Sequence, residues 1–212
     1  TMTTVVSLEN VSIEYRRATT KSRSMKQATV EILKGKRKYQ TFRALDNVSF
    51  EINSGEILAI IGRNGSGKST LLRVLAGLLP TSAGTIEWSG GQEDVPLSEE
   101  AHYLGHRDAL KPALTPLELL TFWRSLLGRA ATEPFAALER VGLAHAAYLP
   151  SAYLSAGQRR RLSLARLLVA HRPLWLLDEP TAALDQASET MFGALVADHL
   201  TRGGLALIAT HA

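Results

Sequence analysis

The segment Gly62-Arg63-Asn64-Gly65-Ser66-Gly67-Lys68-Ser69 narrows the choice of fold more than any other part of this chain. It follows an apolar run at 57–61, which predicts a strand buried on both faces, and it precedes leucines at helical spacing from position 71. A glycine-rich turn between a strand and a helix lets backbone N–H groups point inward as an anion-binding nest, and the helix N-terminus adds partial positive charge. The spacing matches G-x-x-x-x-G-K-S/T, the phosphate-binding P-loop. It predicts a nucleotide site at the end of a strand.

A second apolar run, at 174–177, ends in two adjacent carboxylates, Asp178 and Glu179. Taken alone, such an acidic strand end is ordinary, but phosphoryl transfer needs both a metal and a positioned nucleophile. Neighbouring strand residues point to opposite sides, so the two carboxylates can have different roles. Asp178 suits a Mg²⁺ ligand acting through water, and Glu179 suits the group that polarises the attacking water. We expect Lys68 to reach the β- and γ-phosphates and the Ser69 hydroxyl to bind Mg²⁺.

The stretch Leu154-Ser155-Ala156-Gly157-Gln158 reads as a loop that opens a helix with small and polar residues. Such a start offers a second anion site, with the Ser155 hydroxyl and the Gly157 N–H available. The alternative is an ordinary helix N-cap, which the same residues would also form.

Charge and composition exclude several classes of protein. The chain has no cysteine, which excludes a disulfide scaffold, Cys-ligated metal and thiol catalysis. No apolar run approaches the ~18 residues of a membrane span, and the N-terminus lacks the features of a signal peptide, so we expect an intracellular protein. Ten basic residues and one acid lie between Arg16 and Arg43. This segment is either a patch for anionic lipid, a polyanionic substrate or nucleic acid, or a solvated loop.

Strand and helix patterns alternate along the chain. Strands are expected at 5–13, 48–52, 85–88, 174–177 and 205–210, and helices at 24–34, from 71 and at 186–202. The stretch 115–170 is helical in pattern throughout, with breaks at glycines and prolines. The order predicts an α/β fold with a largely parallel sheet and an inserted α-helical part.

The order of these motifs resembles the ATP-binding cassette (ABC) ATPases over nearly the whole chain. The motifs are the P-loop, Leu154–Gln158, the LLDEP stretch at 176–180, Asp185 and His211. The resemblance implies a P-loop core of residues 1–88 and 171–212 with an N-terminal antiparallel β part, and an α-helical signature subdomain at 89–170. It further implies ATP and Mg²⁺ as cofactors.

The resemblance also assigns roles to single residues. Tyr15 matches the aromatic residue that stacks on adenine, although it could instead be a tyrosine at the edge of solvent. Asp185 matches an aspartate at the dimer interface, and His211 a histidine that contacts the γ-phosphate. The expected nucleotide contacts are Tyr15, Asn64, Gly65, Ser66, Gly67, Lys68, Ser69, Thr70, Ser155, Gly157, Gln158 and Asp185. The expected catalytic residues are Lys68, Glu179 and His211, and the expected metal ligands are Ser69, Asp178 and His106.

Two positions depart from the family pattern. Ala156 replaces the first glycine of the usual LSGGQ signature, a change of one methyl group that should leave the site intact. His106 stands where the family has the glutamine of the Q-loop. Imidazole can bind metal or water, but the usual amide contact is lost, so the role of this loop in metal binding and coupling is open.

The two parts of the chain resemble different subfamilies. From about residue 88 the chain is similar to the haem-exporter ATPase of cytochrome c maturation, which shares the histidine and the alanine. Residues 1–87 are similar to ATPases of polysaccharide or O-antigen export, in which the loop between the first two strands is also long and basic. These likenesses indicate a recombined or engineered chain with a seam between about 70 and 90. The end one residue after His211 further indicates a shortened C-terminus.

The resemblance implies ATP hydrolysis that powers export across a membrane, of the haem-export and cytochrome c biogenesis type. The alternatives are polysaccharide export (O-antigen or teichoic-acid-like) and a recombined cassette that binds nucleotide without transport. A cassette acting on nucleic acid or ribosomes is disfavoured, because the chain has one P-loop and no heptads. The expected partners are integral-membrane permease subunits and a second copy in a nucleotide-sandwich homodimer, with no nucleic acid. The expected location is peripheral, on the cytoplasmic face of the inner or plasma membrane.

Overall fold

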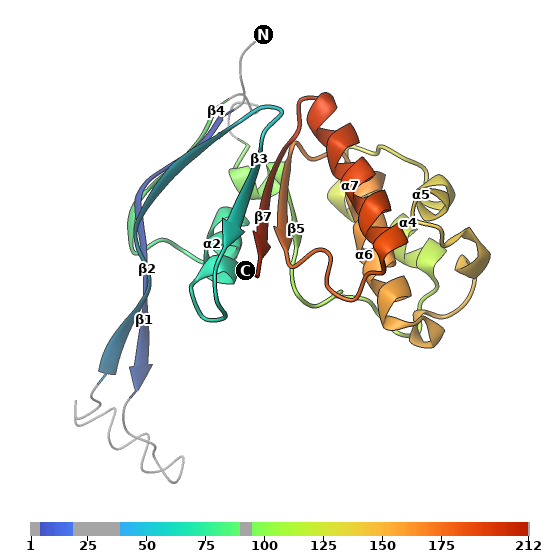
Figure 1. Cartoon of the computed structure of the whole chain (residues 1–212), viewed down its shortest axis with the longest axis horizontal. Helices are drawn as coiled ribbons and strands as arrows, with labels where there is room; N and C mark the ends of the chain where they lie inside the picture. Colours follow the sequence, from blue (N-terminus) through green and yellow to red (C-terminus); the bar gives the residue numbers. More distant parts are fainter. Residues whose placement is uncertain (1–4, 19–38, 90–94, 212) are drawn as a thin grey trace.

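The computed structural model describes residues 5–18, 39–89 and 95–211, which form two sheets and a group of helices (Figure 1). The helix predicted at 24–34 lies outside these residues. The first sheet contains β1 (Val5–Ala18), β2 (Tyr39–Asn53) and β4 (Ala83–Ser89) in the order β2-β1-β4, and all pairs are antiparallel. The predicted N-terminal antiparallel part is therefore confirmed.

Strands β1 and β2 are longer than the sequence pattern predicts. They continue as a two-stranded ribbon that pairs Tyr15 with Phe42 and ends at the pair Ala18 and Tyr39. The outer parts of the basic segment are thus paired strand and not a loop. The reason is cross-strand pairing, which a short alternating pattern does not reveal. The guanidinium of Arg43 lies 3.1 Å from Glu14 and 2.9 Å from Asp46, so this basic side chain is locally neutralised.

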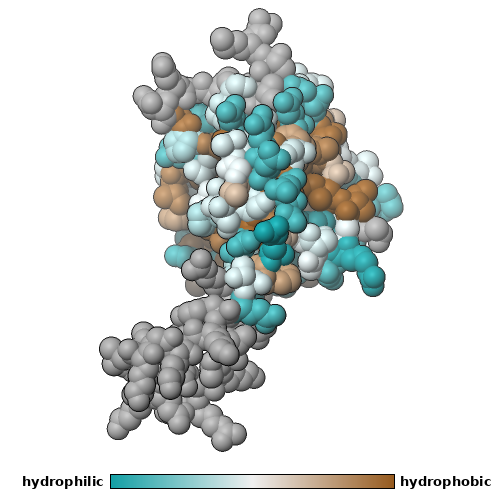
Figure 2. Space-filling view, turned by 90° about the vertical axis from the view of Figure 1, so that its left-hand side faces the viewer, coloured by the Kyte–Doolittle hydropathy of each residue, from teal (hydrophilic) through white to brown (hydrophobic). Residues whose placement is uncertain are grey.

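The N-terminal sheet has one face toward the core and one toward solvent. Residues such as Val6, Leu8 and Ile52 are buried, whereas Glu51 and Glu87 are exposed. Figure 2, which looks at this side of the molecule, shows a band of hydrophilic residues there. The predicted alternation of Val48, Phe50 and Ile52 with polar residues is therefore confirmed.

The second sheet is entirely parallel. Its strands are β3 (Ile57–Ile61), β7 (Leu205–Thr210), β6 (Leu174–Asp178) and β5 (Ala101–Leu104), in the order β3-β7-β6-β5. All five residues of β6 are buried, as predicted for a central strand. The prediction that the apolar run at 57–61 is buried on both faces is wrong: Leu58 and Ile60 pack on the core, but Ile57 is 50% and Ile61 62% exposed. Within the described part of the chain, β3 is an edge strand with one packed face.

Helix α2 (Lys68–Leu75) follows the P-loop and packs on β6 and β7, with Leu72 and Leu75 in the core shared by the two sheets. Helices α4 (Pro116–Leu127), α5 (Pro134–Arg140), α6 (Ala156–Val169) and α7 (Gln186–Thr201) surround a second core on the other side of the parallel sheet.

The expected helical stretch 115–170 contains α4, α5 and α6. Short helix α3 (Leu97–Glu100) and strand β5 also fall within 89–170, and β5 joins the parallel sheet beside β6. In the described ranges no helix is both long and apolar enough to cross a membrane.

Candidate active site

A cavity of about 410 Å³ lies between the ribbon of β1 and β2 and the carboxyl ends of the parallel strands. The P-loop follows β3, His106 follows β5, Asp178 and Glu179 end β6, and His211 follows β7. Ligands of open parallel sheets bind at this end of the strands. The lining residues are Tyr15, Phe42, Ala44, Asn64, Gly65, Ser66, Gly67, Lys68, Ser69, Thr70, His106, Asp178, Glu179 and His211. Of these, only Phe42 and Ala44 lie outside the predicted set.

The P-loop backbone is arranged for an anion. Gly65 and Gly67 have φ of 85° and 94°, values at which a side chain would be strained. A Cβ on Gly67 would also lie 2.6 Å from the carbonyl oxygen of Ala44, so this loop approaches β2 too closely for any other residue. Among the described residues no side chain caps the N-terminus of α2, so its first N–H groups are free of side-chain acceptors there.

Lys68 is 8% exposed and points back into the loop. Its ammonium donates to the carbonyl oxygen of Gly62 and, at 3.2 Å, to that of Arg63. A buried ammonium needs such partners, and they keep the charge at the mouth of the anion nest. A phosphate in the cavity would form charge-assisted hydrogen bonds with it.

Two carboxylates at the end of β6 face the cavity with incomplete hydrogen bonding. Asp178 is 2% exposed, and its Oδ2 is buried without a hydrogen-bond partner. Burying a carboxylate oxygen in this way is costly unless a cation binds it. Mg²⁺ prefers oxygen ligands and keeps several waters, so the Asp178 carboxylate and the Ser69 hydroxyl, both lining the cavity, suit this ion when phosphates supply the other ligands. Across the part of the chain that is described, no cluster of three or more His, Asp and Glu side chains forms a self-sufficient metal site.

Glu179 has a backbone conformation that is rare for residues other than glycine, with φ of 50°. Its N–H donates to the carbonyl oxygen of Ala209 at 2.9 Å, and its Oε1 lies 3.2 Å from Nε2 of His211. The side chain is 16% exposed, which leaves it accessible from the cavity. The carboxylate therefore lies beside an imidazole and next to the space that phosphates would occupy, and among the described residues its Oε1 has no hydrogen-bond partner.

The four predicted residues of the signature and interface do not line this cavity. Ser155 is the N-cap of α6: its Oγ accepts from the Gln158 N–H at 3.2 Å, and Oε1 of Gln158 accepts from the Ser155 N–H at 2.8 Å. Gly157 follows the cap, and a Cβ there would lie 3.1 Å from the carbonyl oxygen of Ala183. Asp185 caps α7 by accepting from the Ser188 N–H at 2.9 Å. Hydrogen bonding to the Ser188 side chain, and then to this N–H, lowers the pKa of the Asp185 carboxyl.

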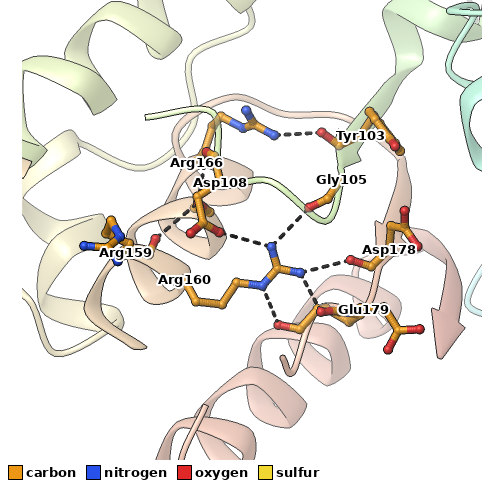
Figure 3. A network of polar contacts seen from close by, with 10 residues as sticks. Tyr103, Gly105, Asp108, Arg159, Arg160, Arg166, Asp178 and Glu179 are labelled. Carbon is orange, nitrogen blue, oxygen red and sulfur yellow. Dashed lines mark hydrogen bonds and ion pairs between the residues drawn. The ribbon is translucent and has the colours of Figure 1, made fainter. Parts of the chain in front are cut away.

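Sequence reasoning missed two residues that contact this region. Phe42 is paired in register with Tyr15, so both aromatic rings line the cavity from adjacent strands. Arg160 is 3% exposed and contacts the turn after β6 (Figure 3). The sequence alone does not single out Arg160, because it stands between two other arginines. The structure shows that it lies on the buried stripe of α6 with Ser163, Leu164 and Leu167.

A protein-family profile described as ABC transporter matches residues 45–182, and the chain belongs to this family. Its ATP-binding subunits hydrolyse ATP, and the chain is an ATPase of this kind.

Among curated proteins, the chain is 61% identical over 166 residues to the cytochrome c biogenesis ATP-binding export protein CcmA of Rhodopseudomonas palustris strain BisB5, covering 78% of this chain and 83% of the relative. It is 58% identical over 172 residues to the CcmA protein of Bradyrhizobium diazoefficiens, covering 81% and 84%. Among solved structures, it is similar to the ATP-binding cassette MJ0796, a dimer in a post-hydrolysis state bound to ADP and Pi. The TM-score is 0.75 with 25% identity, over 98% of this chain and 88% of that one.

Proposed function

We propose that this chain is the ATP-hydrolysing subunit of a transporter that powers export for cytochrome c biogenesis, with haem as the cargo class. The observation that carries the proposal is the gathering of the P-loop, Asp178, Glu179 and His211 around one cavity. The high identity to relatives named for cytochrome c biogenesis and export supports the cellular role.

Nucleotide binding follows from the cavity walls. The triphosphate lies along the N–H groups of residues 64–70, with Lys68 on the β- and γ-phosphates. The adenine stacks on the surface formed by Tyr15 and Phe42, which stand side by side on adjacent strands. Ser69 and Asp178 would hold Mg²⁺, which neutralises charge on the phosphates when bound. His106 lines the same cavity and reaches this region from the loop after β5.

Hydrolysis needs a base near the γ-phosphate. Glu179 polarises the attacking water, because its carboxylate faces the cavity and can accept a proton. His211, whose Nε2 lies 3.2 Å from that carboxylate, offers its N–H to the γ-phosphate.

The signature residues act on the nucleotide of a second copy. Ser155, Gly157, Gln158 and Asp185 lie outside the cavity of their own chain, so their contact with nucleotide requires a homodimer that sandwiches ATP. The Ser155 Oγ accepts within its cap and still has a hydrogen to donate to a phosphate. The dimer docks on integral-membrane permease subunits at the cytoplasmic face of the membrane.

The Glu179→Gln substitution tests the chemistry. The variant should bind ATP as wild type does and lose nearly all turnover, because an amide cannot act as the base. Fluorescent-nucleotide titration and phosphate release measure the two properties. Glu87→Gln, an exposed change on the outer face of β4, is the matched control and should retain activity. Wild-type turnover in the Glu179 variant would remove this residue from the catalytic role.

Mixing two inactive variants tests the dimer. Lys68→Ala removes the P-loop charge, and Ser155→Ala removes the signature hydroxyl. In a mixed dimer, one of the two composite sites regains both groups, so the mixture should hydrolyse ATP faster than either variant alone. A mixture no faster than its parts would contradict the sandwich.

Pull-down with membrane permeases tests the transport role. The chain should be retained by a haem-export permease and not by a polysaccharide-export permease. Neutralising Lys34, Lys36, Arg37 and Lys38 should leave complex formation nearly unchanged if docking depends on the haem-export-like part of the chain. Retention by the polysaccharide permease alone, lost on neutralisation, would instead favour polysaccharide export.

A further inference from the structure

The side chain of Arg160 crosses from the first turns of α6 to the turn that follows β6 (Figure 3). Its Nη2 donates to the carbonyl oxygens of Asp178 at 3.0 Å and Glu179 at 2.6 Å, and its Nε donates to that of Pro180 at 3.0 Å. Three consecutive carbonyl groups are thus held by one guanidinium. They lie where β6 leaves the sheet, and of the three residues only Asp178 is paired with a neighbouring strand. The Glu179 carbonyl also accepts from the Ala182 N–H at 3.1 Å.

The remaining donors of Arg160 hold a second loop. Nη1 donates to the carbonyl oxygen of Gly105 at 3.1 Å and to Oδ1 of Asp108 at 3.2 Å. A guanidinium has five N–H donors in a rigid planar fork, and here each has an acceptor. The side chain is 3% exposed, so water cannot replace these contacts readily.

Both loops carry cavity residues. Glu179 stands in the first with φ of 50°, and its carbonyl faces Arg160 while its carboxylate faces His211. His106 lies in the second, between the two residues that Arg160 holds. A residue in an unfavourable backbone conformation keeps it only if its surroundings over-determine it. The contacts of Arg160 with the carbonyls of Asp178, Glu179 and Pro180 add to that constraint. Two backbone hydrogen bonds also contribute, from the Glu179 N–H to Ala209 at 2.9 Å and from the Ala182 N–H to the Glu179 carbonyl at 3.1 Å.

We propose that Arg160 is a positioning residue for ATP hydrolysis, which fixes the carboxylate of Glu179 through the carbonyls of its turn. The inference rests on the proposed function. Arg160 belongs to α6, the helix capped by Ser155. It therefore also links the position of α6 to the two loops that carry cavity residues. Arg160 does not line the cavity and touches no reacting atom.

The test replaces Arg160 with lysine in the full chain. Lysine keeps the charge but lacks the planar fork, so it cannot hold both loops. A misplacement of the catalytic carboxylate of Glu179 by about 1 Å costs about 100-fold in turnover. We therefore expect kcat, divided by the number of nucleotide-binding sites found by titration, to fall by about that factor. The KM for ATP should change by less than about threefold, since no phosphate or base contact is removed.

Arg166→Lys is the matched control for loss of a buried guanidinium. Arg166 is on the same helix and lies 4.8 Å over the ring of Trp123. It donates to the carbonyl oxygen of Tyr103 at 2.7 Å, on β5 before the loop of His106 begins (Figure 3). Its variant should melt at a lower temperature but keep kcat per site. If Arg166→Lys loses as much kcat as Arg160→Lys, general packing of α6 explains both losses, and the inference is overturned.

The double variant Arg160→Lys with Glu179→Gln separates positioning from structure. If Arg160 acts through Glu179, the double variant should be as slow as Glu179→Gln alone, because effects of residues acting as a unit are not additive. A further loss of the full Arg160→Lys factor would overturn the inference.

If Arg160→Lys does not fold, Asp108→Ala removes one hydrogen-bond acceptor of the guanidinium at a partly exposed site. A lower kcat at unchanged ATP affinity supports the inference, and wild-type kcat refutes it. Absence of ATPase activity in wild type itself would instead reject the proposed function.

Discussion

His102 should make the stability of this protein depend on pH in a range where carboxylates do not titrate. The side chain lies on β5, is 3% exposed and shares a hydrogen bond of 2.9 Å between Nε2 and the carbonyl oxygen of Ala170. Burial lowers its pKa most, the hydrogen bond to Ala170 raises it, and the charges of Arg166 and Arg172 lower it as well, so that the pKa falls from 6.5 to about 3.

The sign follows from proton binding. Because the folded-state pKa lies below that of the unfolded chain, His102 contributes its full stability above pH 6.5 and loses it as the pH falls toward 3. Between pH 7.5 and 5 the loss is about 2 kcal/mol. His199, stacked on Trp175 with ring centroids 3.9 Å apart, has its pKa lowered by burial to about 4 and adds a similar loss. Together they remove about 4 kcal/mol, a large share of the 5–15 kcal/mol typical of a domain.

Urea unfolding at pH 7.5 and pH 5 measures this effect. His102→Gln keeps an amide donor for Ala170 but cannot titrate, so its loss between the two pH values should be about half that of wild type. The comparison uses the difference in the free energy of unfolding between the two pH values, so any destabilisation by the substitution that is the same at both pH values cancels. His145→Gln, at an exposed position, is the control and should follow wild type. An unchanged pH difference in His102→Gln would refute the reasoning.

Two further changes test the nucleotide cavity. Phe42→Ala should raise the KM for ATP about tenfold with little change in kcat, because one wall of the base site is lost and stacking contributes about 1–3 kcal/mol per base; steady-state kinetics check this, and an unchanged KM would place the base elsewhere. Gly67→Ala should abolish binding of a fluorescent ATP analogue, since its Cβ would lie 2.6 Å from the Ala44 carbonyl oxygen at φ of 94°; normal binding would mean that the loop can move away from β2.

The contiguous motifs of the site could be predicted because their chemistry depends on local spacing. A strand, a glycine turn and a helix start at Lys68 make a phosphate site wherever they occur, and Asp178 and Glu179 follow from the end of a buried run. The alternation of strands and helices likewise predicted the parallel sheet and the run of helices between Thr115 and Ala170.

Other features of the site could be known only from the tertiary structure, because they depend on which helices and strands pack against each other. The three arginines at 159–161 look alike in sequence, yet only Arg160 faces the turn after β6, because α6 packs there with one particular rotation. Phe42 enters the cavity through its register with Tyr15, and β3 exposes Ile61 because it lies at a sheet edge. Local propensity does not contain these facts. They arise when packing pairs residues that are distant along the chain, and the free energy of that packing selects one rotation, one register and one strand order.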